Sequence, residues 1–600
     1  MADISKQPTP IYAEELGVQL RFRHREPEAE DGVPPIALWR NNLTALSQHY
    51  NLYFIAYSED IYVYKPSFPF QILPDDPKLI IQPTLAKNDG IGYINPDMPH
   101  LINQIAVANL GNEEILVCVR DDGNAAAYYT RPIQLAVEEN NRSEEQLQML
   151  DTKYLGKPFF SVCVNSSAWG ISVHTEARMI AISCNDSTIS VFAFALGKNG
   201  SFEWSHRSEH EDFYGFMTLD SSTPGVRGLF MERSKPLRMI LRGHKTNIPS
   251  ISFCNSLYHD PKGTFLASLD IDSNLFLWNI WSQTTPSTIN VVHCYYSNDD
   301  NPGWTVICPD ILSFRKVKNF SKAVGLEATQ VKKVTDTLLD VSGRRFQIPN
   351  SSSRFAGYDI TEIASNSLTS ASEFINPLSF MIDMPDSPDF PDSPGIVLEQ
   401  KEEDDFDFSR WDFQNHQGPS TSFHPVDMPI SNPPIFCSLK FDLILMDQNH
   451  RPHIVFRRLV KQDLPSNLQN ITQMDRLNMS AYIPELGLVA IATQLGRVAL
   501  LSLTATPQGQ LAFKVEHILP FDSQEKAKKR PEVALLGLAV GPIQGRGVGR
   551  NEDGVLDGEE AWRKIEGERR YRLLLTYYDH SVLSYEIGRK KQGKIDIFLF

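Results

Sequence analysis

The chain has 600 residues, with 57 basic and 73 acidic side chains, so its formal net charge is -16. This charge repels a phosphate backbone, so direct binding to nucleic acid is not expected from composition. The hydrophobic fraction of 42% is typical of a globular protein, and the sequence lacks the apolar run of about eighteen residues that a membrane-spanning helix needs. No membrane association is expected.

The cysteines are odd in number and include no C-x-x-C pair. They are Cys118, Cys163, Cys184, Cys254, Cys294, Cys308 and Cys437. This pattern predicts buried thiols in a reducing compartment rather than a disulfide framework. The opening residues MADISKQPTP lack the basic and apolar regions of a signal peptide. A nuclear and cytoplasmic location is therefore expected.

The first predicted elements are paired strands. Residues 1–35 are expected to form a flexible N-terminal segment. Residues 53–66 and 114–130 then show the apolar alternation of antiparallel strand pairs. Residues 137–150 have helical spacing with a polar face, which predicts a helix at the rim of the fold.

A more regular unit follows, in which a turn carboxylate precedes an aromatic residue. The strand predicted at 170–174 leads to a second strand at 181–183. Asp186 follows in a turn, and Phe192 stands six residues later on a third predicted strand.

The segment from LRGHKTNIPSISF to HDPKGTFLASLDIDSNLFLWNI carries this pattern most completely. Gly243 and His244 open it, and strands are predicted at 248–253, 265–269 and 275–278. A Gly-His pair followed by three strands and a tryptophan is typical of one WD-type propeller blade. The alternative is a surface hairpin with a chance Gly-His pair.

A polar network is expected inside this blade. Asp272 precedes Trp278 by six residues, and its carboxylate is predicted to accept turn amides and the imidazole of His244. Ser268 is predicted to bridge His244 and Trp278. Such a network would fix strand register in an otherwise apolar blade.

Insertions separate the later blades. Residues 324–341 have helical spacing and predict a second rim helix. Residues 350–434 are rich in Ser, Pro and Asp and are expected to be a largely disordered acidic insertion. Five aromatic residues among its carboxylates are candidate partner-binding residues: Phe390, Phe406, Phe408, Trp411 and Phe413.

Two serines in the insertion, Ser387 and Ser393, precede proline and are candidate phosphorylation sites for a proline-directed kinase. The alternative for the whole insertion is a solvated spacer whose aromatic residues fold back on the propeller.

The C-terminal part repeats the blade pattern. Strand pairs are predicted at 440–456 and 486–503. A strand at 533–540 precedes a unit in which Asp579 stands six residues before Tyr585. With the earlier units this makes about seven, so the sequence predicts an all-β, seven-bladed propeller in two parts, 36–349 and 435–600. Residues 594–600, KIDIFLF, are expected to form the strand that closes the ring.

Other motifs favour structural roles. The basic runs 526–530 and 589–591 are read as solvated loops, with nuclear-import signals as the alternative. The glycine-rich stretch 541–554 lacks the G-K-[ST] ending of a phosphate-binding loop. His100, His174 and His244 are expected to make structural hydrogen bonds. No catalytic, metal-binding or cofactor-binding set is recognised, although a hydrolase using the central channel remains a further possibility.

The unit at residues 243–278, the acidic insertion and the final EEAWRKIEGERRYRLLLTYYDHSVLSYEIGR resemble the fungal Crt-ten family of WD-repeat proteins. The resemblance covers most of residues 36–600. It implies a protein-interaction scaffold that regulates transcription of ribonucleotide reductase genes, with a cullin-type ubiquitin ligase adaptor and transcription components as partners. Residues 278–281 read W-N-I-W and depart from the W-D-x-R adaptor-docking signature. The alternatives are a nucleic-acid-associated propeller and an assembly scaffold unrelated to transcription.

Overall fold

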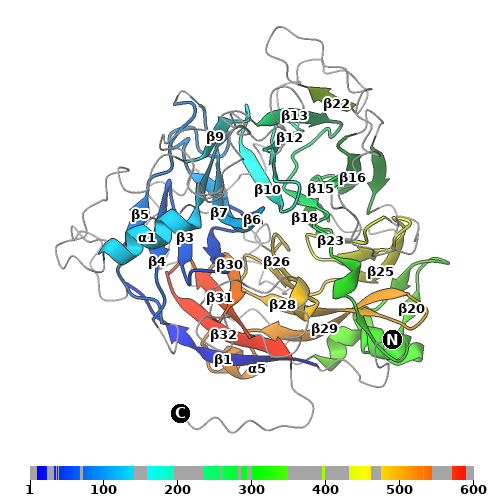
Figure 1. The fold of residues 1–600 in the computed structure, drawn as a ribbon. Coiled ribbons are helices and arrows are strands. Elements are labelled where there is room, and N and C mark those ends of the chain that lie inside the picture. Colours follow the sequence, from blue (N-terminus) through cyan, green and yellow to red (C-terminus); the bar gives the residue numbers. More distant parts are fainter. Residues whose placement is uncertain are drawn as a thin grey trace, which may run out of the picture.

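The computed structural model describes most of the chain as seven β-sheets arranged around a common centre (Figure 1). The described residues are 10–22, 33–35, 37, 40–67, 72–88, 90–140, 158–194, 236–256, 260, 263–281, 286–292, 301–348, 395–398, 432–460, 475–531, 533–543 and 570–589. Each sheet contains four consecutive antiparallel strands or a close variant of them, which makes it one blade of a propeller.

The first four blades follow one another along the chain. Blade 1 consists of β2 (Thr44–Leu46), β3 (Tyr53–Tyr57), β4 (Asp60–Tyr64) and β5 (Leu79–Ile81). Blade 2 consists of β6 (Ile102–Leu110), β7 (Glu113–Arg120), β8 (Asn124–Tyr129) and β9 (Phe160–Cys163). Blade 3 consists of β10 (Ala168–His174), β11 (Met179–Cys184), β12 (Thr188–Ala193) and β13 (Leu237–Arg242), with β22 (Gly395–Leu398) added outside β13. Blade 4 consists of β14 (Ser250–Phe253), β15 (Phe265–Leu269), β16 (Asn274–Asn279) and β17 (Ser287–Asn290).

The last three blades are less regular. Blade 5 consists of β18 (Gly303–Ile307), β23 (Ile435–Leu439), β24 (Leu443–Met446) and β25 (Pro452–Phe456), extended by β21 (Leu339–Asp340) and β20 (Lys332–Lys333). Blade 6 consists of β26 (Met479–Ile483), β27 (Leu488–Ala492), β28 (Val498–Ala505) and β29 (Leu511–Leu519), with β19 (Arg315–Lys316) parallel to β28. Blade 7 consists of β30 (Leu535–Pro542), β31 (Tyr571–Tyr577), β32 (Val582–Arg589) and the N-terminal strand β1 (Ile11–Gln19).

Short helices occupy the connections. They are α1 (Thr130–Asn140), η1 (Ile311–Ser313), α2 (Phe320–Val324), η2 (Ala328–Gln330), η3 (Ser342–Gln347), η6 (Pro484–Leu486) and α5 (Asp522–Lys526). The helix predicted at 137–150 therefore begins earlier, at Thr130, and residues 141–150 lie outside the described residues.

The core of the molecule lies between adjacent blades, where the apolar faces of neighbouring sheets meet. One cluster joins Leu46 and Tyr53 of blade 1 to Leu574 of blade 7, and another joins Val117 of blade 2 to Ile180 of blade 3. Further clusters fill each following interface around the ring. Each blade is buried on both faces, so strands such as β11 and β27 read as continuous apolar runs rather than as strict alternations.

The antiparallel order gives the propeller two distinct faces. Connections from the second to the third strand of each blade, and from each blade to the next, lie on one face, which we call the turn face. Connections from first to second and from third to fourth strands lie on the opposite face, which we call the insertion face. The connections that follow β8, β12, β18 and β30 begin on the insertion face.

The ring is closed by the N-terminal strand. β1 pairs antiparallel with β32, from Ile11 opposite Arg589 to Gln19 opposite Val582. The expectation that residues 1–35 form a flexible segment is therefore wrong for 11–19, because this strand completes blade 7. Residues 594–600, which were expected to close the ring, lie outside the described residues.

The helix expected at 324–341 is also absent. Gly325, with a φ of 71°, ends α2 immediately after Val324. Beyond it, Val341 packs between blades 5 and 6, whereas Leu338 packs against the cluster shared by blades 4 and 5. The apolar residues that suggested one helical face thus serve two different cores.

Candidate functional site

Blade 4 contains a buried chain of polar side chains. The Nε1 of Trp278 donates to the Ser268 hydroxyl over 2.8 Å, and that hydroxyl lies 2.6 Å from Nε2 of His244. The Nδ1 of His244 lies 2.8 Å from Oδ2 of Asp270. An ionised carboxylate only accepts, so His244 donates from Nδ1 and accepts the Ser268 proton at Nε2. Burial lowers the pKa of His244 below its usual range, which keeps this imidazole neutral.

The carboxylate of this network is Asp270, so the prediction of Asp272 is wrong. Asp270 directly follows β15 and points into the blade, where its Oδ1 also accepts the amide of Asn274 over 2.8 Å. Asp272 lies two residues further into the turn and is exposed. The other three predicted members, His244, Ser268 and Trp278, are brought together as described.

The two other units with this sequence pattern, in blades 3 and 7, have the turn carboxylate but lack the histidine network. Asp186 accepts the amide of Thr188 over 3.1 Å, and Asp579 accepts the amide of Ser581 over 3.0 Å. Such Asx-type bonds stabilise the turn before the next strand. Their aromatic partners, Phe192 and Tyr585, are buried core residues: Phe192 packs on Phe160, and the Tyr585 hydroxyl donates to Gln524 over 2.9 Å.

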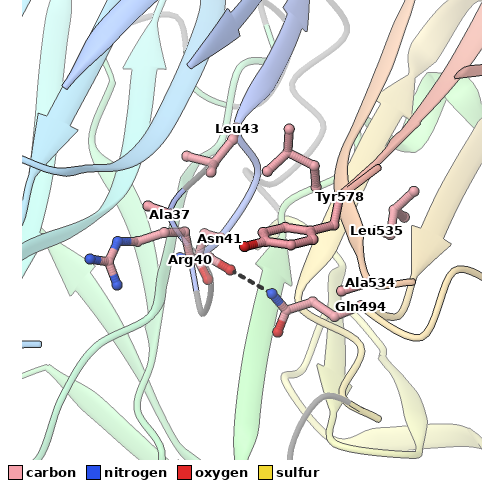
Figure 2. Close-up of a pocket in the computed structure, with 9 residues that line it drawn as sticks. Ala37, Arg40, Asn41, Leu43, Gln494, Ala534, Leu535 and Tyr578 are labelled. Atoms are coloured by element: carbon pink, nitrogen blue, oxygen red, sulfur yellow. Dashed lines mark hydrogen bonds between the residues drawn. The ribbon is translucent and has the colours of Figure 1, made fainter. Parts of the chain in front are cut away.

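The segment leading into blade 1 crosses the centre of the turn face. The carbonyl of Arg40 accepts from Gln494 of blade 6 over 3.1 Å (Figure 2). It also accepts from Asn478, at the start of blade 6, over 3.3 Å. The Asn41 amide donates to the Asn103 carbonyl over 3.0 Å, and its side chain reaches the Pro249 carbonyl before blade 4. These bonds link blades 1, 2, 4 and 6 across the central channel.

A small, partly open pocket lies beside this crossing. Its lining includes Arg40, Gln494 and Tyr578, but no histidine, carboxylate, serine or cysteine (Figure 2). Burial lowers the pKa of Arg40 to about 10, and the charge of Asp121 acts against that shift. A nucleophile and its base are therefore not placed together at this point.

Near this crossing, hydrogen bonds to two residues of blade 2 hold a loop of the turn face. Oδ2 of Asp121 accepts the amides of Ile94 over 2.8 Å and Asn95 over 3.0 Å. Oδ1 of Asn124 accepts the amides of Ala86 and Lys87 over 2.9 and 3.0 Å. We call residues 86–100, of which all but residue 89 are described, the anchored loop.

The anchored loop presents apolar side chains to solvent. Ile91 is 80% exposed and Met98 is 49% exposed. His100, at the end of the loop, lies 2.6 Å from the buried carboxylate of Asp122 through its Nδ1. A loop fixed by buried carboxylates while its apolar side chains stay in water has the properties of a preformed contact surface. The sequence pattern did not reveal it, because its anchors lie some thirty residues away along the chain.

Several predicted residues lie outside the described part of the chain. These are the candidate partner-binding residues Phe390, Phe406, Phe408, Trp411 and Phe413, the candidate phosphorylation sites Ser387 and Ser393, and Cys294. The other six cysteines form no disulfide, and five of them are buried. Among the described residues, no group of His, Cys, Asp or Glu is placed to hold a metal ion, and no helix is both long and apolar enough to cross a membrane.

Two residues of the basic run 526–530 form ion pairs with other parts of the fold. Lys529 forms an ion pair of 2.9 Å with Glu15 of β1, and Nε of Arg530 lies 2.9 Å from Glu525 of α5. His174 makes the expected structural bond, 3.0 Å from the carbonyl of Asp260.

The chain resembles WD-repeat proteins of two eukaryotes. It is 26% identical over 246 residues to an uncharacterized WD repeat-containing protein of Schizosaccharomyces pombe, covering 41% of this chain and 40% of that protein. It is 25% identical over 245 residues to a WD40 repeat-containing protein of Dictyostelium discoideum, covering 41% and 25% of the two chains. The match thus spans less than half the length of either relative.

Among solved structures, the WD40 domain of Toxoplasma gondii coronin matches with a TM-score of 0.43 and 8% identity, covering 98% of this chain and 89% of that one. The blade assignment itself rests on the strand pairing described above. The model of the CRT10 family matches residues 22–298 and 462–587, which include strands of six of the seven blades and leave out blade 5. This chain, a seven-bladed WD-type β-propeller with a long insertion in blade 5, therefore belongs to the CRT10 family.

Proposed function

We propose that this protein is a scaffold that regulates transcription of ribonucleotide reductase genes by bringing other proteins together in the nucleus and cytoplasm. Membership of the CRT10 family carries this proposal. The seven-bladed propeller fold and the WD-repeat relatives support a protein-interaction scaffold. A closed propeller with a rigid contact loop on one face suits assembly of partners.

The anchored loop is the surface we assign to a protein partner on the turn face. Ile91 and Met98 are the residues that we expect to contact the partner. Both are apolar and exposed, while Asp121 and Asn124 hold the backbone of the loop. Little conformational entropy is lost when such a loop is bound. The fitting partner offers an apolar pocket that receives the two side chains.

We further propose association with a cullin-type ubiquitin ligase through its adaptor. Asn279 and Trp281 stand where the adaptor-docking signature has aspartate and arginine, and Trp278 is buried in blade 4. We therefore expect the adaptor to bind an exposed surface of the propeller and not residues 278–281.

The test compares cells that lack this protein with cells complemented by defined variants. Loss of the protein should change ribonucleotide reductase transcript levels, and the wild-type chain should restore them. Combined Ile91→Asp and Met98→Asp substitutions should fail to restore them, and affinity purification should lose a transcription or ligase component. Leu135→Asp is the matched control, because Leu135 on α1 is also 49% exposed but lies on the insertion face.

Unchanged transcript levels in cells without the protein would refute the transcriptional role. Full activity of the doubly substituted chain would instead refute only the assignment of the anchored loop. Purified wild-type chain that bound DNA in a salt-dependent manner would favour the nucleic-acid alternative.

A further inference from the structure

The outer edge of blade 3 is paired with a segment from a distant part of the chain. β22 belongs to the insertion that leaves blade 5 between β18 and β23, yet it lies beside β13 (Figure 1). The pairing is antiparallel, with Met239 opposite Leu398, Ile240 opposite Val397 and Leu241 opposite Ile396. Blade 4 stands between the two blades that this segment connects.

An outermost strand of a propeller blade can accept another strand. Its outward N–H and C=O groups have no neighbour within the blade, so an extended segment can pair with them through main-chain hydrogen bonds. β13 suits this role because it is six residues long and has an apolar centre, Met239–Leu241, that is buried in the structure.

The charges around the two strands are complementary. β13 carries Arg238 near its start and Arg242 at its end. The sequence around β22 is strongly acidic, with Asp392 before it and Glu399 directly after it. Residues 350–434 contain 15 carboxylates and three basic side chains, so β22 is a short apolar segment within a negatively charged stretch. Favourable long-range attraction therefore directs this part of the insertion to β13.

We propose that β13 is a docking edge for an extended apolar segment flanked by carboxylates, and that Gly395–Leu398 is the occupant supplied by the chain itself. The tethered segment is present at a high effective concentration, so it masks the edge against similar segments of other proteins. Displacement of β22 frees β13 for a similar segment of another protein. The binding of segments from other proteins to β13 rests on the proposed scaffold role. The docking of β22, which belongs to the same chain, does not.

A disulfide trap in the purified full chain tests the docking in cis. Ile240→Cys combined with Val397→Cys places two thiols directly opposite each other, and mild oxidation should link them. Ile240→Cys combined with Ile396→Cys is the register control, because neighbouring residues of a strand point to opposite faces. Mass spectrometry of the proteolysed protein identifies the linked peptides. Equal linkage in both pairs, or none in the first, would overturn the proposal.

Peptide binding tests whether β13 is a docking edge in its own right. A fluorescent peptide with the sequence of residues 390–403 is titrated into the wild-type chain and into a full-length variant whose residues 395–398 are replaced by Gly-Ser-Gly-Ser. The variant should bind at least about tenfold more tightly, because the tethered competitor is removed. A peptide with the same composition in scrambled order should bind neither.

Equal affinity of the 390–403 peptide for the two proteins would overturn the docking edge. Both experiments use purified protein and no transcriptional readout. Their failure would therefore leave the regulation of ribonucleotide reductase genes untouched, and failure of that regulation would leave these outcomes unchanged.

Discussion

Asp121 of blade 2 accepts a hydrogen bond of 2.7 Å from the hydroxyl of Ser167, which directly precedes the first strand of blade 3. Both side chains are buried. The same carboxylate holds the amides of Ile94 and Asn95 through its other oxygen. One side chain therefore fixes the junction of two blades and the shape of the anchored loop.

Replacement of this carboxylate should be costly. Asp121→Ala removes the acceptor of three hydrogen bonds at a buried position, and the free energy of unfolding should fall by about 3 kcal/mol. Denaturant titration measures the loss. Asp97→Ala, at an exposed position of the same loop, should change stability by less than about 0.5 kcal/mol. Similar losses for the two variants would contradict the role assigned to Asp121.

The two aspartates of blade 4 should behave differently. Asp270→Ala removes the acceptor of the buried His244 and of the Asn274 amide, so unfolding should become easier by about 2 to 4 kcal/mol. Asp272→Ala should cost less than about 0.5 kcal/mol because its side chain is exposed. Thermal and chemical unfolding of both variants measure these changes. A larger loss of unfolding free energy for Asp272→Ala than for Asp270→Ala would support Asp272 as the carboxylate of the network.

The strand that closes the ring offers a third comparison. Ile11 at the start of β1 is 2% exposed and packs in the core between blades 6 and 7, whereas Leu16 on the same strand is 44% exposed. Ile11→Ser should destabilise the protein by about 2 to 4 kcal/mol, and Leu16→Ser by less than about 0.5 kcal/mol. Amide hydrogen exchange along β32 should accelerate in the Ile11 variant alone. Unchanged exchange there would mean that β1 does not hold the ring closed.

Acid should weaken the fold through His580. Burial, aided by the nearby charge of Arg21, lowers the pKa of His580 from 6.5 to about 4. The unfolded chain therefore binds a proton more readily, so the stability due to the neutral imidazole is full above about pH 6.5 and is lost as the pH falls toward 4. The greatest loss is about 3 kcal/mol.

His580→Gln tests this origin of the acid sensitivity. The variant keeps a polar side chain near the Tyr57 hydroxyl, which lies 3.2 Å from Nδ1 of His580 in the wild type. Its free energy of unfolding should fall less steeply than that of the wild type between pH 6.5 and 4. Parallel curves for the two proteins would show that His580 does not contribute. His244 and His174 also have pKa values lowered by burial, so a residual slope is expected in the variant.

The blades could be predicted from sequence because their signals are local. Strand pairs such as 486–503 show apolar runs interrupted by a turn glycine, and Gly496 indeed takes a φ of 87° at that turn. The choice between Asp270 and Asp272 could not be made this way. Both precede Trp278 at plausible spacings, and only the end of β15 at Leu269 determines which carboxylate faces the blade interior.

Long-range pairing explains the remaining differences. β1 has a weak pattern, with exposed residues at its centre, and becomes a strand because β32 offers it an edge. The anchored loop has no periodic pattern at all, and its shape depends on Asp121 and Asn124, which follow it in the chain. Apolar residues between 324 and 341 mimic a helix because two separate cores happen to use similar spacings.

The pairing of β1 with β32 has a consequence for biosynthesis. β1 leaves the ribosome long before its partner β32, which is translated only after the strands of blades 1 to 6. Blades 1 to 6 can form during synthesis, but the seam of the ring must wait for the final strands. Until then the nascent propeller exposes two open sheet edges. Chaperones that shield such edges should therefore engage this protein late in translation, and premature termination before blade 7 should yield a product that aggregates.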